Sequence, residues 1–326
     1  MSSLSVLMAN YNYGRYIADA LEGIFSQSYQ PLEVIVVDDA STDNSVDIIK
    51  GFMQKHPNLK LIQNEKNMGT LYSINLALEN ASGEYVYSAA SDDKVLPEFF
   101  IKSINLLCKY PQAGLSCSDI LIFQDNKYIE NKYYLSKRAS YFSPNEVVHL
   151  MRREPISIIA PHGVIIKHSL LLEAGGYQEA LKWTCDSFVH HVIAFRYGIC
   201  YIPEVLVMTR KHGAQFGGYM RTDSRSERDV ISESINMARK PQYRDVFSMF
   251  QETAPFSLYP WEVLRVVVGD RKNWDFLSFK LFRFALFDKI VRRLLLRVFP
   301  MSLCRKMVNS SRNVRASIGK IFLGVK

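Results

Sequence analysis

Short strand-like runs alternate with helical patterns through the first 125 residues of the chain. The β-rich runs cover residues 5–8, 34–37, 59–62, 85–88 and 115–118. Between them lie helical patterns at about 16–27, 45–54, 71–79 and 97–109. Repeated strand–helix–strand units favour an α/β fold with a doubly wound, mostly parallel sheet flanked by helices. Ligands bind beyond the carboxyl ends of the strands in such sheets, so polar residues at those ends are the first candidates for a site.

The composition excludes several other classes of protein. Of the 326 residues, 48% are hydrophobic and 22% are charged, which rules out a disordered or collagen-like chain. The five cysteines are widely spaced and include no C-x-x-C pair, so neither a disulfide framework nor a zinc knuckle is expected. A reducing compartment is the simpler interpretation. The first residues carry no basic segment, and they are predicted to form a strand rather than a signal peptide.

The net charge of +8 is unevenly distributed along the chain. Residues 270–326 contain 14 Lys and Arg against three Asp and Glu, whereas residues 1–269 contain 26 against 29. The strand–helix alternation is also lost from about residue 232 onward. We therefore expect two parts, an α/β catalytic domain at 1–231 and a helical basic region at 232–326.

The basic region is apolar but repeatedly interrupted by cations. No uninterrupted run reaches the ~20 residues that are needed to span a bilayer. Lys289, Arg292, Arg293 and Arg297 share one helical face, which is typical of a helix lying on an anionic membrane surface. The alternative is a helical subdomain packed on the body with its charges solvated. Nucleic-acid binding is not expected, because no recognised motif accompanies the charge.

Two pairs of carboxylates stand where predicted strands end. Asp38-Asp39 follows the run at 34–37, and Asp92-Asp93 follows the run at 85–88. Either pair alone is explained by helix capping or turn chemistry. Two pairs at one edge of a sheet instead favour a divalent cation, because oxygen ligands suit Mg2+ or Mn2+ and substrate phosphates complete the shell. The sequence contains no G-x-G-x-x-G after the first strand, no G-x-x-x-x-G-K-[ST] and no G-x-S-x-G, which disfavours nicotinamide enzymes, P-loop ATPases and α/β-hydrolases.

An ordered series of motifs resembles one family. The matching segments are Leu4–Asn12, Tyr13–Tyr16, Phe25–Tyr29, Val36–Asp43, Asn67–Gly69, Gly83–Tyr85, Ser91–Asp93 with Pro97, Gly175–Tyr177, Trp183–Asp186, Tyr201–Glu204 and Arg210–His212. Together they resemble the family 2 glycosyltransferases of the GT-A fold over roughly residues 3–215. The series is specific as a whole, although no single segment is. The resemblance implies an inverting transferase that uses a nucleotide-diphospho-sugar and a divalent metal, Mn2+ or Mg2+.

Position by position, the resemblance implies a role for each matched residue. The residues expected to bind the nucleotide sugar are Ala9, Tyr11, Asp38, Asp39, Asp92 and Asp93. Of these, Tyr11 and Asp39 would hold the nucleobase. Asp93 and His212 would contact the metal, with His212 near the diphosphate. Asp186 would be the general base, taking the proton of an acceptor hydroxyl as it attacks the anomeric carbon.

Each of these residues also has a simpler interpretation. Asp186 precedes a helical pattern and could be its N-cap, His212 could be an ordinary loop histidine, and Tyr11 could be a core aromatic. His190 lies four residues after Asp186 and is interpreted as packed rather than catalytic. Three positions depart from the family pattern: Ala90 where a further Asp is common, Ile74 where Arg is common, and Cys185 where Glu is common. These departures bear on metal affinity and donor choice.

Three functions follow from the residues and the resemblance. The first is a glycosyltransferase of surface-polysaccharide or lipopolysaccharide synthesis. It would act on a glycan or lipid-linked glycan acceptor in the cytoplasm, at the cytoplasmic membrane face. The second is a catalytically silent relative kept as a binding or scaffold subunit, which the three departures keep open. The third, nucleotidyl transfer, is disfavoured because no Gly-rich basic loop follows the first strand.

Overall fold

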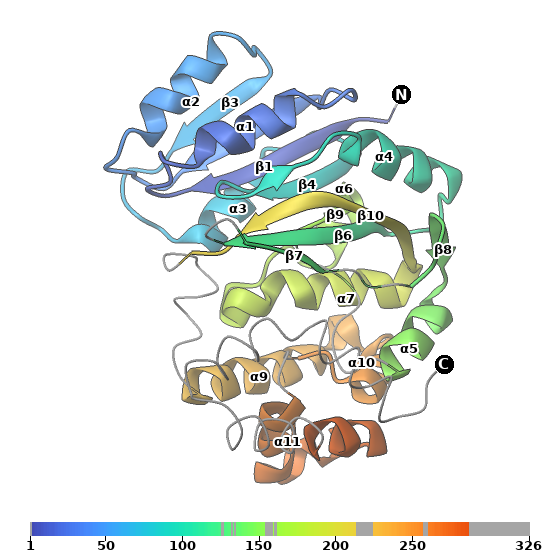
Figure 1. The fold of residues 1–326 in the computed structure, drawn as a ribbon. Helices are drawn as coiled ribbons and strands as arrows, with labels where there is room; N and C mark the ends of the chain where they lie inside the picture. The colour runs from blue at the N-terminus through green and yellow to red at the C-terminus, as the bar shows by residue number, and fades with distance from the viewer. Residues whose placement is uncertain are drawn as a thin grey trace.

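The computed structural model describes residues 2–286, apart from 125–126, 132, 134, 154–158, 160–161, 213–223 and 257–259 (Figure 1). Its first elements follow the predicted alternation. They are β1 (Leu4–Asn10), α1 (Ile17–Phe25), β2 (Glu33–Asp38), α2 (Ser45–Met53), β3 (Leu59–Gln63), α3 (Thr70–Glu79), β4 (Tyr85–Ala90), β5 (Lys94–Val95), α4 (Phe99–Lys109) and β6 (Leu115–Gln124). Every strand and helix predicted up to residue 118 is thereby confirmed in type and order, and the short β5 is an addition.

The second half of the chain completes the sheet and adds a helical layer. Its elements are β7 (Lys127–Asn131), β8 (Ser140–Phe142), α5 (Pro144–Arg153), β9 (Val164–Lys167), α6 (His168–Glu173), η1 (Glu179–Thr184), α7 (Cys185–Tyr197), β10 (Ile199–Arg210), α9 (Ser224–Ala238), η2 (Pro241–Tyr243), α10 (Phe247–Thr253), α11 (Pro260–Gly269) and η3 (Arg271–Phe276). Residues 279–286 form one more short helix.

One sheet runs through the molecule in the order β3-β2-β1-β4-β9-β6-β10-β5, with β7 beside β6 and β8 beside β10. The β3, β2, β1 and β4 strands are parallel, as expected from their helical connections. β9 is antiparallel to both β4 and β6, and β10 is parallel to β6. β6 and β10 therefore point the same way as β1, and the carboxyl ends of these strands meet at one edge.

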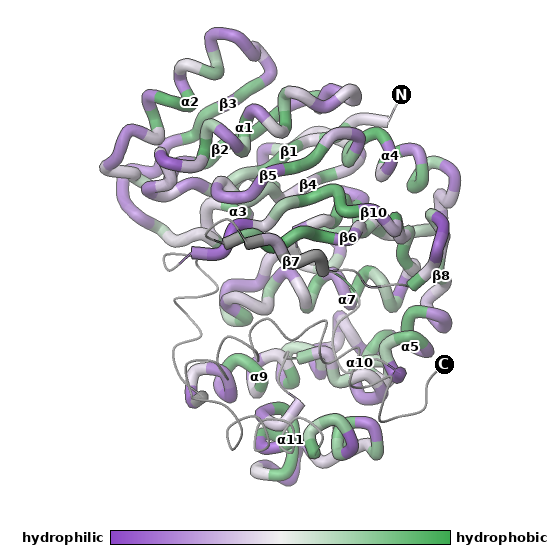
Figure 2. Tube along the Cα trace, viewed as in Figure 1, coloured by the Kyte–Doolittle hydropathy of each residue, from purple (hydrophilic) through white to green (hydrophobic). Residues whose placement is uncertain are grey.

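Alternate residues of the central strands pack into two different cores. In β1, Val6 and Met8 join the core under α1, α2 and α4, whereas Leu7 joins the core on the opposite face. β2 and β4 divide their side chains in the same way. This period of two is what a strand buried on both faces requires. Figure 2 shows the strands as largely apolar, with helices that carry a polar face outward.

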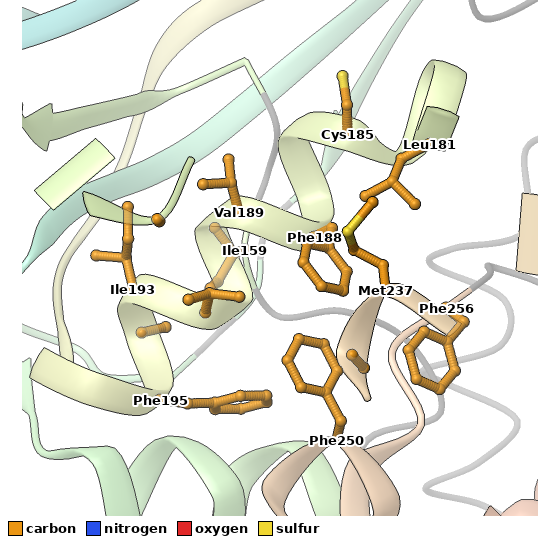
Figure 3. Close-up of a cluster of buried hydrophobic side chains, with 14 of the residues drawn as sticks. Ile159, Leu181, Cys185, Phe188, Val189, Ile193, Phe195, Met237, Phe250 and Phe256 are labelled. Atoms are coloured by element: carbon orange, nitrogen blue, oxygen red, sulfur yellow. The ribbon is translucent and has the colours of Figure 1, made fainter. Parts of the chain in front are cut away.

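The core on the α3 and α7 face continues into the C-terminal helices. Phe250 of α10 lies between Phe188 and Phe195 of α7, with ring centroids 5.1 and 5.2 Å apart (Figure 3). Met237 of α9 and Phe256 belong to the same cluster of buried side chains. α7 is thus held between the sheet and the C-terminal helices.

Some expectations concern parts of the chain that the structure does not describe. The cationic face at Lys289, Arg292, Arg293 and Arg297 lies outside the described residues. The expected division after residue 231 falls within α9, and it stays a prediction. In the described ranges, no helix is long and apolar enough to cross a bilayer.

Candidate active site

The loops that follow β1 and β2 are tied together by polar side chains. Asp38 is fully buried, and its carboxylate accepts hydrogen bonds from Asn10 Nδ2 (2.8 Å), the Ser41 amide (2.9 Å) and Ser41 Oγ (2.6 Å). Asn12 Oδ1 in turn accepts from the Thr42 amide at 2.7 Å. The Asp38 carboxylate therefore holds the loop, as turn chemistry predicts.

Asp39 anchors a third loop to the same edge. Its Oδ1 accepts from Asn64 Nδ2 at 2.7 Å and from the Met68 amide at 2.8 Å, and its Oδ2 accepts from the Gly69 amide at 2.8 Å. Gly69 has a φ of +96°, a conformation that favours glycine, and it directly precedes α3. A carboxylate offers about four acceptor positions, so Asp39 retains capacity for one more donor on Oδ2.

Tyr11 and Ala9 lie at the end of β1. The Tyr11 side chain is 41% exposed, so the core-aromatic interpretation is wrong. Ala9 pairs with Val37 of β2 on one side and with Ala90 of β4 on the other, and its carbonyl accepts from Ser91 Oγ at 3.1 Å. The register thus places Asp39 and the Asp92-Asp93 pair after the ends of β2 and β4, the two strands that flank β1.

Asp92 is paired with His212, which follows β10. His212 Nε2 lies 2.9 Å from Asp92 Oδ2. The His212 ring also contacts the rings of Tyr13 and Tyr16, with centroids 5.7 and 5.1 Å away. Burial, followed by the charges of Asp92 and Asp93, raises the pKa of the Tyr13 hydroxyl. His212 is therefore part of a defined cluster of polar and aromatic side chains, and its role at a metal stays a prediction.

Asp93 is paired with a histidine that no motif indicated. Asp93 is only 5% exposed, its Oδ1 accepts from the Arg210 amide at 2.8 Å, and its Oδ2 lies 3.1 Å from His162 Nδ1. Burial raises the pKa of the Asp93 carboxyl. Burial alone would lower the pKa of His162, but the Asp93 carboxylate, with Asp186 and Asp92, raises it to about 9. The pair therefore retains a proton at neutral pH.

Asp186 lies in the first turn of α7, where Thr184 rather than Asp186 is the N-cap residue. The N-cap interpretation of Asp186 is wrong. Its carboxylate accepts from the Ser187 amide, and it lies within electrostatic reach of His162. His162 thus lies beside Asp93, and the charge of Asp186 acts on it. His190, on the same helix, is buried, and burial lowers its pKa to about 3, which confirms its packed interpretation.

A hydrogen-bonded unit around Tyr177 supports the α7 side of the site. Asn75 of α3 donates from Nδ2 to the Tyr177 carbonyl at 2.8 Å and accepts from the Tyr177 amide at 3.1 Å. The Tyr177 hydroxyl lies 2.7 Å from Ser88 Oγ of β4. Gly176, at a φ of +64°, allows the close approach of Asn75. α3, β4 and the loop before α7 are thereby fixed to one another.

Arg210 links the segment that carries Asp92 and Asp93 to α1. Its Nε donates to the Asp92 carbonyl at 3.1 Å, and its Nη2 lies 3.2 Å from Asp19 Oδ2. The guanidinium also lies over the rings of Tyr16 and Phe123, 4.6 and 4.5 Å from their centroids. These contacts fix the end of β10 and hence the position of His212.

Sequence reasoning missed His162 and assigned no role to Tyr13, Tyr16 or Arg210. Tyr13, Tyr16 and Arg210 lie within motifs that match the family, and no other feature of the sequence indicated them. His162 had no such signal, because nothing in its spacing from Asp93 indicates the contact. Of the three departures, Ile74 and Cys185 are buried in the core, and burial raises the pKa of the Cys185 thiol.

Comparisons with known proteins point to one family. The model of Glycosyl transferase family 2 matches residues 5–173. The uncharacterized glycosyltransferase YibD of Escherichia coli is 34% identical over 328 residues, which cover 96% of this chain and 89% of that protein. Glycosyltransferase GlyG of Streptococcus pneumoniae is 27% identical over 70% of this chain and 77% of its own. TuaG of Bacillus subtilis, a glycosyltransferase named for teichuronic acid biosynthesis, is 30% identical over 42% of this chain and 55% of its own.

Solved structures share the fold at low sequence identity. Residues 1–349 of Staphylococcus aureus TarS, in complex with UDP-GlcNAc, match 88% of this chain and 79% of that one, with a TM-score of 0.63 and 18% identity. The mannosyltransferase PcManGT of Pyrobaculum calidifontis, in complex with GDP-Man and Mn2+, matches 98% of this chain and 87% of its own, with a TM-score of 0.58 and 19% identity.

Proposed function

Because the chain belongs to glycosyltransferase family 2, we propose that it transfers a sugar from a nucleotide diphosphate to a hydroxyl of a glycan or lipid-linked glycan, inverting the anomeric carbon. The observation that carries this proposal is the position of His162. It lies 3.1 Å from Asp93, and the charge of Asp186 also acts on it, which supports one site for the carboxylate pair and the candidate base.

The donor nucleotide is assigned to the ends of β1 and β2. Tyr11 presents an exposed ring against which a base can stack, and Asp39 Oδ2 has room to accept an N–H from that base. Asp38 supports this surface through the loop that it holds, and we assign Ala9, near the end of β1, to the same donor surface. UDP-GlcNAc and GDP-Man in the two solved neighbours support a nucleotide-sugar donor.

The residues at Asp92 and Asp93 fit a divalent cation that is bound together with the donor. Carboxylate oxygens and an imidazole suit Mn2+ or Mg2+, and we assign Asp93 and His212 as the ligands. Within the described part of the chain, no three His, Cys, Asp or Glu side chains are grouped closely enough to hold a metal by themselves. Donor phosphates would therefore complete the shell. Such a cation stabilises the negative charge of the departing diphosphate as a Lewis acid.

Asp186 is assigned as the general base. An acceptor hydroxyl is a poor nucleophile, and a carboxylate within hydrogen-bond reach takes its proton during attack on the anomeric carbon. Attack from the side opposite the diphosphate inverts that carbon. The packing of α7 between two layers holds Asp186 in place, and positioning of this kind lowers the barrier.

We assign the acceptor to a cell-surface polysaccharide or lipopolysaccharide made at the cytoplasmic membrane face. TuaG, which is named for teichuronic acid biosynthesis, supports this class of acceptor. In this proposal residues 1–231 carry the chemistry, and the basic region at 232–326 brings the enzyme to an anionic membrane surface.

The test is a donor panel followed by product analysis. The purified chain is incubated with UDP-, GDP- and dTDP-sugars, with Mn2+ or Mg2+, and with glycan acceptors, and nucleotide release is measured. We expect release with one nucleotide class and a product whose anomeric configuration, read by NMR, is opposite to that of the donor. A product of retained configuration would overturn the inverting assignment. Donor binding without turnover under every acceptor condition would favour the scaffold function instead.

A further inference from the structure

Exposed apolar side chains are concentrated near the end of the described chain. Of the thirteen large hydrophobic side chains that are exposed among the described residues, six lie between residues 268 and 286. We call these six the apolar patch: Val268, Trp274, Leu277, Phe279, Phe282 and Leu286. Phe279 is 81% exposed and Phe282 is 55% exposed, which is unusual for phenylalanine.

The helix at 279–286 is apolar on two opposite faces. Phe279, Phe282 and Leu286 follow the spacing i, i+3, i+7, which places them on one side. Leu281, Phe284 and Ala285 are buried against the rest of the protein. The inner face therefore explains how this helix is attached, whereas the side chains of the outer face are exposed among the residues that the structure describes.

Hydrogen bonds fix the backbone that carries the patch. Lys280 Nζ donates to the Thr253 carbonyl at 2.9 Å. Arg239 donates from Nη1 to Asn273 Oδ1 at 2.8 Å, and its Nη2 donates to Asp275 Oδ1 at 2.6 Å. The Trp274 indole donates to the Val268 carbonyl at 3.4 Å, which brings two members of the patch together. These hydrogen bonds hold in place the backbone that carries the patch.

The charge around the patch favours an anionic partner. Arg271 and Lys272 are exposed beside Trp274, and the Arg271 guanidinium lies 5.7 Å from its ring centroid. The nearby acids are paired with cations, Asp275 with Arg239 and Asp270 with Lys272. In the sequence that follows, residues 287–326 contain ten Lys and Arg against one Asp. A partner that accepts aromatic side chains and also attracts cations is the interface of an anionic bilayer.

We propose that the apolar patch inserts into the interfacial layer of an anionic membrane, with Trp274, Phe279 and Phe282 as its anchors. This inference extends the membrane association proposed above and locates it on residues 268–286. It does not depend on the roles of the site residues. In Figure 1, α11 and the helices beside it lie at the opposite end of the molecule from α2.

The test is flotation of the full chain with vesicles of phosphatidylcholine, with and without 30% phosphatidylglycerol. Wild-type protein should float with the anionic vesicles, and Phe279→Ser with Phe282→Ser should reduce partitioning by at least about tenfold, because each buried Phe contributes more than one decade of affinity. The control is Leu32→Ser with Met53→Ser, two side chains that are 51% and 36% exposed at the other end of the molecule. The control should float like wild type.

A second measurement locates the contact. Brominated phosphatidylglycerol should quench the tryptophan fluorescence of the wild type, and Trp274→Phe should remove most of that quenching.

Equal flotation of the Phe double variant and the wild type would overturn the proposal. So would conversion of a wild-type dimer to a monomer by the double variant, since a second copy would then cover the patch. If aqueous iodide failed to quench Trp274 in the absence of vesicles, residues 287–326 would cover the patch. That result would also overturn the proposal. Nucleotide release by the double variant, measured without vesicles, should equal that of the wild type, which separates this test from that of the catalytic assignment.

Discussion

His162 Nδ1 lies 3.1 Å from Asp93 Oδ2, on a carboxylate that is almost completely buried. Asp92 and His212 form a second pair beside it at 2.9 Å. Two adjacent acids are thereby each matched with an imidazole. The raised pKa of His162 offsets part of the repulsion between the two neighbouring carboxylates, at the edge proposed above to bind the donor diphosphate.

Replacing His162 should strengthen metal binding. In the proposed site Asp93 is a metal ligand, so the imidazole competes with a cation for the same carboxylate. His162→Gln should therefore lower the dissociation constant for Mn2+ by about three- to tenfold, as removal of a competing ion pair predicts. The measurement is an EPR titration of free Mn2+. His149→Gln, on the exposed face of α5, is the control and should leave the value unchanged. Weaker binding by His162→Gln would instead make His162 a ligand.

Asp186→Asn should abolish turnover and leave donor binding intact. The amide retains the shape of the side chain but cannot take a proton, so we expect kcat to fall by roughly 10²–10⁴-fold. Donor affinity, measured by calorimetry, should change by less than about twofold, because Asp186 acts on the acceptor. Asp47→Asn, on the exposed surface of α2, should match wild type in both assays. Normal turnover by Asp186→Asn would exclude it as the base.

Tyr11→Ser should weaken donor binding without affecting the fold. Tyr11 is 41% exposed and belongs to neither buried core, so its replacement should cost little stability. Loss of stacking on a base costs about 1–3 kcal/mol, or roughly five- to 150-fold in affinity. The readout is the dissociation constant of the free nucleoside diphosphate. Tyr128→Ser on β7, a residue with 63% exposure, provides the matched control. Equal affinities for the two variants would place the base elsewhere.

Asn75→Ala should reduce both stability and turnover. The side chain satisfies the amide and the carbonyl of Tyr177, and its loss leaves both groups without those partners. We expect a decrease of about 1–3 kcal/mol in the free energy of unfolding. Asn80→Ala removes a single exposed bond to Leu76 and should cost less than about 0.5 kcal/mol. Urea denaturation distinguishes the two variants, and equal midpoints would contradict the bridging role of Asn75.

Glu33 should make the protein sensitive to acid. Burial opposes its ionisation, but hydrogen bonds from Lys60, Ser5 and Ser82 lower its pKa from 4.5 to about 2. A lowered pKa stabilises the fold fully above pH 4.5, and this stabilisation is lost as the pH falls toward 2. The expected loss is about 2 kcal/mol.

The Glu33 prediction is checked by urea denaturation between pH 7 and pH 2.5. Glu33→Gln should be less stable than wild type at pH 7 and should show a flatter dependence below pH 4.5. Glu79→Gln, at an exposed position on α3, should keep the wild-type dependence. Identical slopes for Glu33→Gln and wild type would show that other carboxyls dominate.

The first half of the fold could be predicted because local sequence and final structure agree there. Each strand from β1 to β4 is a short β-rich run, and each connecting helix has its own amphipathic pattern. The reversal at β9 could not be predicted in the same way. Val164–Lys167 is a short apolar run, and its antiparallel place between β4 and β6 depends on pairing with residues far away in sequence.

The same distinction applies to the residues of the candidate site. Asp38, Asp39, Asp92 and Asp93 follow strands, so their common edge was predictable from topology. His162 was not, because only the folded chain brings it to Asp93. The nucleobase role expected of Tyr11 stays a prediction, and only its alternative as a core aromatic was wrong. The end of a strand at the sheet edge leaves that ring exposed.

The insertion of Phe250 between Phe188 and Phe195 has a consequence for biosynthesis. α7 carries Asp186, yet its outer face is covered by helices that are translated later. A nascent chain that ends before Phe250 lacks the ring contacts that Phe250 makes with Phe188 and Phe195, so α7 with Asp186 has less support. With Asp186 as the proposed base, catalytic competence would depend on helices that are made after the candidate site residues.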